Sequence, residues 1–481
     1  MNEDSTDTEL LAPPEGEGRS DETGQPQRRG HLAPTDDTVE VFLASTLYGV
    51  ATLAAALDAG LFADSTRRIL VVSNHAETPE TLPRLPESPG FAALADHFDE
   101  VVDLNEALSP TNPRLWDPAP SDLPILERHL RLLWNLGDRR IRLVVESIQA
   151  SPAVSLAAVF ADAAIDVYAD GLMVYGPTRV RLPDLVGMRV ERVIHPDLLP
   201  GVTPVLLSEW GSLPTPLDTD VLRVRFEQMA AEATPPVDGP FALVLGQYFA
   251  ALGILDQAEE ERLYVEMIKA AARRGHTRIV FKPHPTSQTR TEVFTSAVDE
   301  FPGVTCTVLQ EKILAEVLFV VADVQLVVSC FSTAMVTARS IFGIPVVTHG
   351  TRMLLQRLKP FANSNRIPLV LIDHLLPTVN DADEPAVDPT LTQGLVTAVG
   401  YTMQGRNNPH LRDAAIEFLT QHFAVAALYI PRKRLTAQDL PGGHVPGRFD
   451  LREYSRRAQM LPVVGPRLTK LQRRVVRTLL R

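Results

Sequence analysis

TRIVFKPHPT, residues 277–286, is an apolar run that stops abruptly at a Lys-Pro-His-Pro loop. The run is rich in β-branched and aromatic residues, which predicts a buried parallel strand followed by a rigid loop. Ligands bind at the carboxyl ends of strands in open α/β sheets, so His284 stands where a ligand would lie. Prolines on either side fix its backbone, and a group that titrates near neutrality suits proton transfer. A strand-end histidine with an ordinary hydrogen bond is the alternative, and the second pair, His195-Pro196, is interpreted as structural.

Strands and helices are expected to alternate on both sides of this loop. The alternation runs from residue 38 to 210, stops in a proline-rich connection, 211–240, and restarts from 241 to 430. This order predicts parallel βαβ units, and hence an α/β fold of two doubly wound Rossmann-like domains facing a cleft. The expected strands are 39–44, 67–73, 100–104, 141–146, 165–168, 241–246, 277–281, 325–329, 344–348 and 369–372. The expected helices are 47–59, 123–136, 153–161, 219–232, 259–274, 332–342, 391–404 and 411–426.

Charge is distributed unevenly along the 481 residues, whose net charge is -13. Residues 1–37 hold ten acidic residues against three arginines and show no apolar period, which predicts a disordered acidic segment. Residues 431–481 form a basic tail with thirteen Lys and Arg against three acidic residues. Within this tail, 466–481 has helical apolar spacing amid arginines, which predicts peripheral contact with an anionic membrane. Docking of that helix on the acidic body is the alternative.

Composition also excludes several classes of protein. The two cysteines rule out a disulfide framework and fit a reducing cytoplasm, and no CxxC or His/Cys metal spacing occurs. No signal peptide and no membrane-spanning stretch is found, and the acidic balance argues against nucleic acid as a partner. The expected localisation is cytoplasmic, with a peripheral place at the inner face of the plasma membrane through 466–481. The pairs Asp218/Asp220 and Asp381/Asp383 lie in connections and are interpreted as turn or cap residues, so no metal site is predicted.

The first half ends two of its expected strands in polar residues. Ser45 and Thr46 follow the first strand where a dinucleotide-binding domain would have GxGxxG, which argues against an oxidoreductase. Their hydroxyls can bind a ligand or cap the next helix. Asp170 follows the fifth strand and is a candidate general base, and Gly171 lets the backbone turn beside a ligand. An ordinary Asp-Gly turn is the alternative.

The second half offers two further polar strand ends. Gly246 and Gln247 end its first strand, where a nucleotide base or ribose often lies. Ser332 and Thr333 stand at a strand-to-helix junction, where hydroxyls and free backbone N–H groups suit a phosphate. An ordinary helix cap, which needs no ligand, is the alternative.

An acidic turn, then a His-Pro pair, then a Ser-Thr pair, all at strand ends, resemble the signatures of bacterial sialyltransferases of two-Rossmann, GT-B type. More closely, the chain resembles the actinobacterial alpha-2,8-polysialyltransferase-like family. The resemblance covers about residues 38–423 and is carried by VFLASTLYGVATLAAALDAGLF, LVVESIQASPA, VYADGLMVYGPTR and FKPHPT.

The resemblance implies an inverting glycosyltransferase that moves sialic acid or a related nonulosonic acid from a CMP-activated donor to a glycan hydroxyl. It makes 38–210 the acceptor-side domain and 241–430 the nucleotide-sugar domain, with neither a metal nor another cofactor. Asp170 would be the base, and His284 would protonate or stabilise the leaving phosphate. The other expected site residues are, for the donor, Gly246, Gln247, Lys282, Pro285, Ser332 and Thr333, and, for the cleft, Ser45, Thr46, Glu146 and Gly171.

The sequence departs from the family's pattern at Ala169, which occupies the first position of the acidic motif. Either Asp170 takes over as base, or Glu146 or Asp166 reaches the cleft, or the activity has changed. Two other functions therefore stay open. One is a transferase or epimerase for another nucleotide sugar on the same fold. The other is a catalytically inactive nucleotide- or glycan-binding protein.

Overall fold

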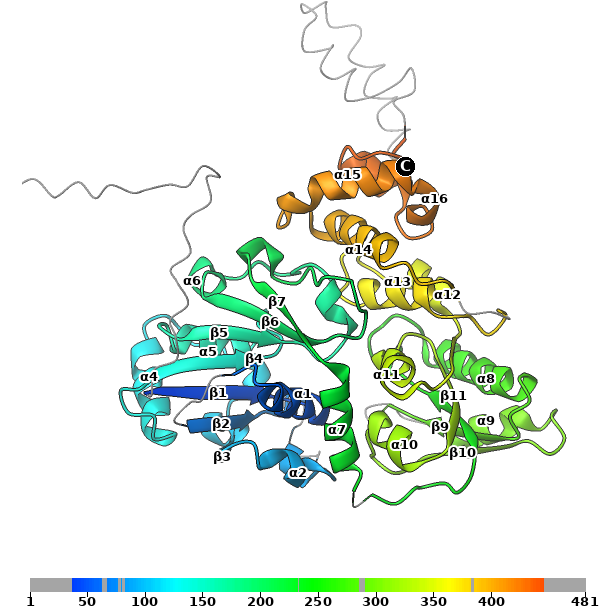
Figure 1. Ribbon diagram of the computed structural model, residues 1–481, viewed down its shortest axis with the longest axis horizontal. Helices are drawn as coiled ribbons and strands as arrows, with labels where there is room; N and C mark the ends of the chain where they lie inside the picture. Colours follow the sequence, from blue (N-terminus) through cyan, green and yellow to red (C-terminus); the bar gives the residue numbers. More distant parts are fainter. Residues whose placement is uncertain are drawn as a thin grey trace, which may run out of the picture.

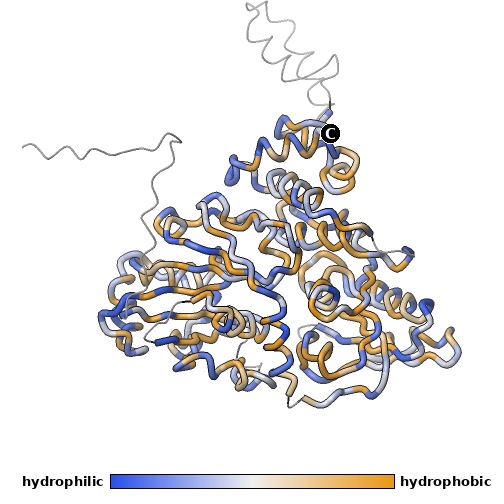
Figure 2. The backbone as a smooth tube through the Cα atoms, viewed as in Figure 1, coloured by the Kyte–Doolittle hydropathy of each residue, from blue (hydrophilic) through white to orange (hydrophobic). Residues whose placement is uncertain are grey.

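The computed structural model describes residues 37–62, 67–76, 79, 83–231, 233–284, 290–381 and 385–444. The predicted disordered segment, apart from Asp37, and the predicted amphipathic helix 466–481 lie outside these residues. The described chain forms two parallel sheets with interleaved helices, one in each half of the molecule (Figure 1). Apolar segments run along the strands of both sheets, and hydrophilic ones lie mainly in turns and on outer helix faces (Figure 2).

The first sheet has seven parallel strands in the order β3-β2-β1-β4-β5-β6-β7. Its centre is almost completely buried, as expected for a parallel sheet with both faces covered. The strand order reverses between β1 and β4, which makes the carboxyl edge at these strands the place for a ligand. The strands are β1 Thr38–Ala44, β2 Arg67–Val72, β3 Glu100–Asp103, β4 Arg140–Val145, β5 Ala164–Tyr168, β6 Val190–Pro196 and β7 Leu213–Leu217.

The second sheet has five parallel strands in the order β10-β9-β8-β11-β12. Its order reverses between β8 and β11, so a second crevice is expected at the carboxyl ends of these strands. The strands are β8 Phe241–Leu245, β9 Arg278–Lys282, β10 Thr305–Val308, β11 Val324–Ser329 and β12 Val346–Thr348.

Helices connect the strands and form the C-terminal end of the described chain. The α-helices of the first half are α1 Leu47–Asp58, α2 Phe91–Ala95, α3 Leu104–Leu108, α4 Leu123–Leu133, α5 Ala153–Val159, α6 Asp184–Gly187 and α7 Thr219–Met229. Those that follow are α8 Gln257–Arg273, α9 Thr291–Thr295, α10 Ala315–Val321, α11 Thr333–Phe342, α12 Thr351–Arg357, α13 Arg366–Leu375, α14 Pro389–Gln404, α15 Arg412–Gln421, α16 Phe423–Ala426 and α17 Arg432–Ala437. Short 3-10 helices include η3 Pro113–Leu115 and η4 Leu172–Tyr175.

The predicted fold class, two doubly wound Rossmann-like domains, is confirmed by these sheets. Several elements differ from the prediction. Residues 369–372, expected as a strand, lie inside helix α13, and the expected helix 411–426 is divided into α15 and α16 at His422. The expected connection, 211–240, contains β7, which joins the first sheet as its edge. The strands β6 and β10 were not expected at all.

Two helices tie the halves together. Helix α7 packs against α1 and α2 of the first half and against α10 and α11 of the second. Helix α14 returns to the first half, where the Gln393 side chain accepts from the Thr203 amide at 2.6 Å and donates to its carbonyl. The two carboxyl edges are therefore held in a defined relation to each other.

Candidate active site at the seam between the halves

Three neighbouring strands of the first sheet bring the predicted polar residues of that half to one edge. Thr46 follows β1, Glu146 follows β4 and Asp170 lies two residues beyond β5, and these strands are adjacent. Thr46 is the N-cap of α1 and accepts from the Gly49 amide at 2.9 Å. Ser45, one residue earlier, lies partly exposed beside it. The capping alternative thus holds for Thr46 in this structure.

The two carboxylates of this edge influence each other. Burial, and then the charge of Asp170, raises the pKa of Glu146 to about 7. Loss of hydration also raises the pKa of Asp170, while a hydrogen bond from Thr46 opposes the rise. Glu146 is 9% exposed and its Oε1 has no hydrogen-bond partner among the described residues, whereas Asp170 is partly exposed. Burial and the neighbouring charge thus favour the protonated form of Glu146, and Asp170 is the more accessible of the two carboxylates.

Three neighbouring strands of the second sheet form the facing edge. Lys282 ends β9, Gly246 follows β8, and Ser332 stands between β11 and α11. The Gly246 amide donates to the Lys282 carbonyl at 2.9 Å. A Cβ on Gly246 would lie 2.9 Å from the ring of Phe281, so only glycine fits this approach.

His284 lies in the loop after β9 with its ring against Tyr248. The two ring centroids are 4.2 Å apart, with an angle of 38° between the planes. Burial, and then the charge of Lys282, lowers the pKa of His284 to about 4, so its imidazole is neutral at pH 7. Burial lowers the pKa of Lys282 as well, against the opposing charge of Glu316. His284 is thus a hydrogen-bond donor in the free protein, and it becomes a proton donor only when a bound anion raises its pKa.

Gln247 links the loops that follow β8 and β11. Its side-chain oxygen accepts from the Phe331 amide at 3.2 Å, and its own amide donates to the Tyr264 hydroxyl at 2.7 Å. Tyr264 in turn donates to Glu260, which also accepts from the amides of residues 249 and 250. The structure thus gives Gln247 an ordering role in this loop, beyond its predicted contact with the donor.

Ser332 and Thr333 open the ten-residue helix α11. The Ser332 hydroxyl accepts from the Ala334 amide at 3.3 Å and is the N-cap. The capping alternative from the sequence therefore describes Ser332 in this structure. Thr333 lies at the first turn, where the positive end of the helix dipole and unpaired amides attract an anion.

The halves touch directly between Gly171 and Thr333. A Cβ built on Gly171 would lie 2.9 Å from Thr333 Oγ1 and 3.2 Å from its Cγ2. The Gly171 backbone is extended, at φ -165° and ψ -170°, so the glycine does not serve the sharp turn expected from the sequence. It serves the contact between the halves. Asp170 is thereby brought beside the N-terminus of α11.

Two residues that the sequence analysis missed complete the cluster. Glu316, on α10, is 3% exposed, and burial raises its pKa to about 7. The charge of Lys282 lowers this pKa and the charge of Asp170 raises it, so Glu316 faces both halves. Tyr48, on α1, is 8% exposed, and burial and the charge of Glu316 raise its pKa. No motif distinguishes this Glu316 from the acidic residues common in first turns of helices.

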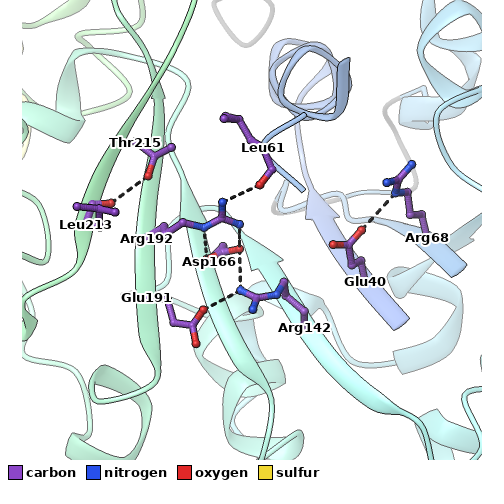
Figure 3. A network of polar contacts seen from close by, with 9 residues as sticks. All are labelled: Glu40, Leu61, Arg68, Arg142, Asp166, Glu191, Arg192, Leu213 and Thr215. Atoms are coloured by element: carbon purple, nitrogen blue, oxygen red, sulfur yellow. Dashed lines mark hydrogen bonds and ion pairs between the residues drawn. The ribbon is translucent and has the colours of Figure 1, made fainter. Parts of the chain in front are cut away.

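Asp166 and His195 are buried inside strands β5 and β6. The carboxylate of Asp166 is fully buried in mid-strand, paired with Arg142 at 3.0 Å and with Arg192 (Figure 3). Arg142 also pairs with Glu191 at 2.9 Å. Loss of one partner from such a network leaves a buried charge unpaired, so Asp166 has a structural role and cannot serve as the base. His195 is 2% exposed in β6, donates from Nδ1 to the Pro196 carbonyl at 3.0 Å and is structural as well.

The remaining residues considered in the sequence analysis are Pro285 and the two Asp-x-Asp pairs. Pro285 and Asp383 lie outside the described residues. Asp218 is the N-cap of α7, and Asp381 accepts from the Thr378 amide at 2.7 Å. The Asp-x-Asp residues described thus act as caps and turn acceptors.

A cavity of about 190 Å³ lies between the halves next to the polar cluster. Its walls are largely apolar and come from η4, the loop 198–202, α11 and α13. Leu172, the residue after Gly171, lines this cavity, whereas Asp170, Lys282 and His284 are not among its lining residues. None of the helices in the described part of the chain has the length and apolar character to cross a bilayer.

Two doubly wound halves with polar strand ends on either side of a seam are the architecture of the GT-B glycosyltransferases. The model of the family described as Alpha-2,8-polysialyltransferase (POLYST) matches residues 40–351. The chain belongs to this family, as the resemblance of its motifs implied, and is a glycosyltransferase by class. A comparison with the curated proteins finds no match.

The chain is also similar to solved structures at low identity. MurG of Acinetobacter baumannii is 11% identical, with 82% of this chain and 99% of that one covered and a TM-score of 0.38. Apo UGT2 of Phytolacca americana is 12% identical, with 85% and 97% covered and a TM-score of 0.39. The heptosyltransferase WaaC of E. coli with ADP is 17% identical, with 64% and 86% covered and a TM-score of 0.34.

Proposed function

We propose that this glycosyltransferase transfers sialic acid or a related nonulosonic acid from a CMP-activated donor to a glycan hydroxyl, with inversion and without a metal. The observation that carries the proposal is the seam itself. There Asp170, with Glu146 behind it, lies beside the start of α11. Glu316 is influenced by the charges of both Asp170 and Lys282, and the charge of Lys282 acts on His284. A base and a set of anion-stabilising donors thus converge on one point, as transfer from a nucleotide sugar requires.

The proposed reaction uses these groups in one displacement. Asp170 accepts the proton of the acceptor hydroxyl, whose oxygen forms a bond to the anomeric carbon of the donor. The bond from that carbon to the phosphate oxygen breaks, and its electron pair leaves with CMP. Lys282, the neutral His284 and the amides of α11 donate to the phosphate as its charge grows. In this proposal Glu146 is protonated and Asp170 carries the negative charge that a base needs.

A comparison of nucleotides tests the donor. We expect CMP to stabilise the full-length protein more than UDP, GDP or dTDP, by roughly 2.7 kcal/mol when CMP is present at about 100 times its dissociation constant. Melting curves with each nucleotide measure this. Equal or greater stabilisation by UDP would assign the site to another nucleotide sugar, which is the second enzyme considered from the sequence.

Ala169 supports one alternative of a different class, a nucleotide- or glycan-binding protein that has lost catalysis. Incubation with CMP-sialic acid separates the two. Release of free CMP, faster with a glycan acceptor, supports the transferase. Binding of the donor without any release of CMP would leave the binding protein as the better assignment.

We also propose that residues 466–481 contact a membrane and that the protein has a peripheral place at the inner face of the plasma membrane.

A further inference from the structure

Helix α4 is apolar on two opposite faces. Leu130 is buried in the first half, at 1% exposure, and Leu123 and Leu126 pack with it against the core. On the other side, Ile125 is 70% and Leu132 72% exposed, and Leu133 follows at 51%. Ile125 and Leu132 are seven residues apart, so they lie on the same outer face, two turns from each other. Nothing in the described part of the chain covers this face.

Basic residues accompany these apolar side chains. Arg128 and His129 lie between Ile125 and Leu132 on the same outer face, and both are exposed. Arg128 makes no hydrogen bond or ion pair with the residues that the structure describes. An apolar stripe bordered by an unpaired guanidinium is thus presented to the solvent.

A second exposed apolar pair lies in the same layer. Leu185, in α6, is 82% exposed, and Met188, just after it, is 76% exposed. Helix α5 lies between α4 and α6 and contacts both (Figure 1). Together, 121–140 and 179–189 contain seven arginines against four acidic residues, in a chain whose net charge is -13. Arg131 and Arg181 pair with Glu127 and Asp184, and Arg179 reaches Ser364 of the other half. Arg128 is therefore the exposed basic side chain that stands within the apolar stripe of α4.

We propose that the α4–α6 surface, defined by Ile125, Leu132, Leu133, Leu185 and Met188, docks on an anionic lipid bilayer. Exposed apolar side chains that enter the interface, beside arginines that meet anionic headgroups, are what such docking requires. A second copy of the chain fits less well. In a two-fold interface the same patch faces itself, so Arg128 would be buried against residues that include no acidic partner. The proposal concerns a surface separate from both the seam and the tail, and it does not depend on the donor.

Co-sedimentation of the full-length protein with vesicles tests it. The vesicles contain phosphatidylcholine alone or with phosphatidylglycerol added, at low and at physiological salt. We expect the parent to bind only the anionic vesicles, and Ile125→Asp/Leu132→Asp to lower the bound-to-free ratio roughly tenfold. Leu252→Asp/Leu428→Asp is the matched control, because it adds the same charge at residues 45% and 55% exposed elsewhere. Arg128→Gln should weaken the salt dependence.

The outcomes separate this surface from the other proposals. The tail is present in every variant, so a loss specific to Ile125→Asp/Leu132→Asp belongs to α4. Should that variant lose helix α4, as seen by its melting curve, Ile125→Gln/Leu132→Gln replaces it. Equal vesicle binding by variant and parent refutes the proposal, and so does a loss of self-association in sedimentation with vesicle binding unchanged. Release of CMP in solution, measured on the same samples, should not change, so a failure of the donor assignment is seen independently.

Discussion

We propose Asp170 as the base because it is partly exposed, whereas Glu146 lies deeper and Asp166 is held by two arginines. Asp170→Asn keeps the volume and removes the basic oxygen. We expect donor binding to survive and transfer to fall by roughly two to four orders of magnitude. Single-turnover transfer and titration with CMP measure the two effects separately. Transfer at the parent rate would give the role of base to Glu146, with Glu146→Gln as the variant to compare.

His284 and His195 allow the two His-Pro pairs to be compared. His284→Ala removes a donor to the leaving phosphate, so we expect turnover to fall by roughly two to four orders of magnitude. His195→Ala leaves a cavity in β6, so it should lower the free energy of unfolding by about 1–3 kcal/mol and leave turnover nearly unchanged. Turnover and melting temperature of both variants check the ranking. A larger loss of turnover in His195→Ala than in His284→Ala would mean that His195, and not His284, takes part in the reaction.

Glu316 makes stability depend on pH in a direction unusual for a carboxylate. Its pKa is about 7 in the folded protein and has its ordinary value of 4.5 when unfolded, so the folded state holds a proton that the unfolded state has lost between these values. Its stabilising contribution is therefore complete below pH 4.5 and is lost as pH rises through 7. Glu316→Gln cannot ionise, so its stability relative to the parent should rise between pH 5 and pH 8, by on the order of 2–3 kcal/mol.

Denaturant titrations at several pH values measure this difference. Glu311→Gln, at an exposed glutamate on the loop before α10, is the matched control and should show no such trend. A constant difference between Glu316→Gln and the parent across this range would mean that Glu316 keeps its charge in the folded protein.

The candidate site residues at strand ends could be predicted from the sequence. The side chains that surround them, which come from distant parts of the chain, could not. Thr46, Glu146 and Asp170 were found because adjacent parallel strands of the first sheet end at one edge, and Lys282 because it ends a strand of the second sheet. Glu316 reaches the same place from a helix of the other half, and no local pattern shows where a helix will dock. The arginines that bind Asp166 likewise come from neighbouring strands, so the sequence left Asp166 open as a candidate base.

At the scale of elements, the errors have definite physical causes. The run 369–372 resembled a strand because four consecutive apolar residues, LVLI, are equally compatible with a buried strand and with a buried helix, and α13 is buried almost all round. Its ten-residue length and Pro368 in the first turn are the signals that favoured a helix. Strand β7 was missed because of Pro214 and Pro216. In an edge strand, residues two apart direct their nitrogens to the same side, here away from β6, so neither proline costs a ladder bond.

At the scale of the whole molecule, the seam is closed around a contact that leaves no room for a side chain. Gly171 has extended backbone angles that any residue adopts, so the only obstacle to Gly171→Ala is Thr333, across the seam. The methyl group would push the halves apart and move Asp170 from the N-terminus of α11. We expect kcat/KM for transfer to fall about 10- to 100-fold, since small misplacements at the reacting atoms have effects of this size. Each half should remain folded.

Small-angle scattering and kinetics together test whether the added methyl group separates the halves. Gly171→Ala should enlarge the radius of gyration, and Gly171→Ala/Thr333→Ala should restore it, because only the Thr333 Cβ then remains nearby, at 3.5 Å. Gly400→Ala is the matched control. It adds a methyl group to the buried helix α14, where the nearest atoms, on Pro177, are at an ordinary 3.6 Å. It should therefore leave the halves in place and stabilise the helix by roughly 0.5–1 kcal/mol. Parent-like scattering and turnover in Gly171→Ala would mean that catalysis does not need the closed seam, and that Asp170 works with the halves apart.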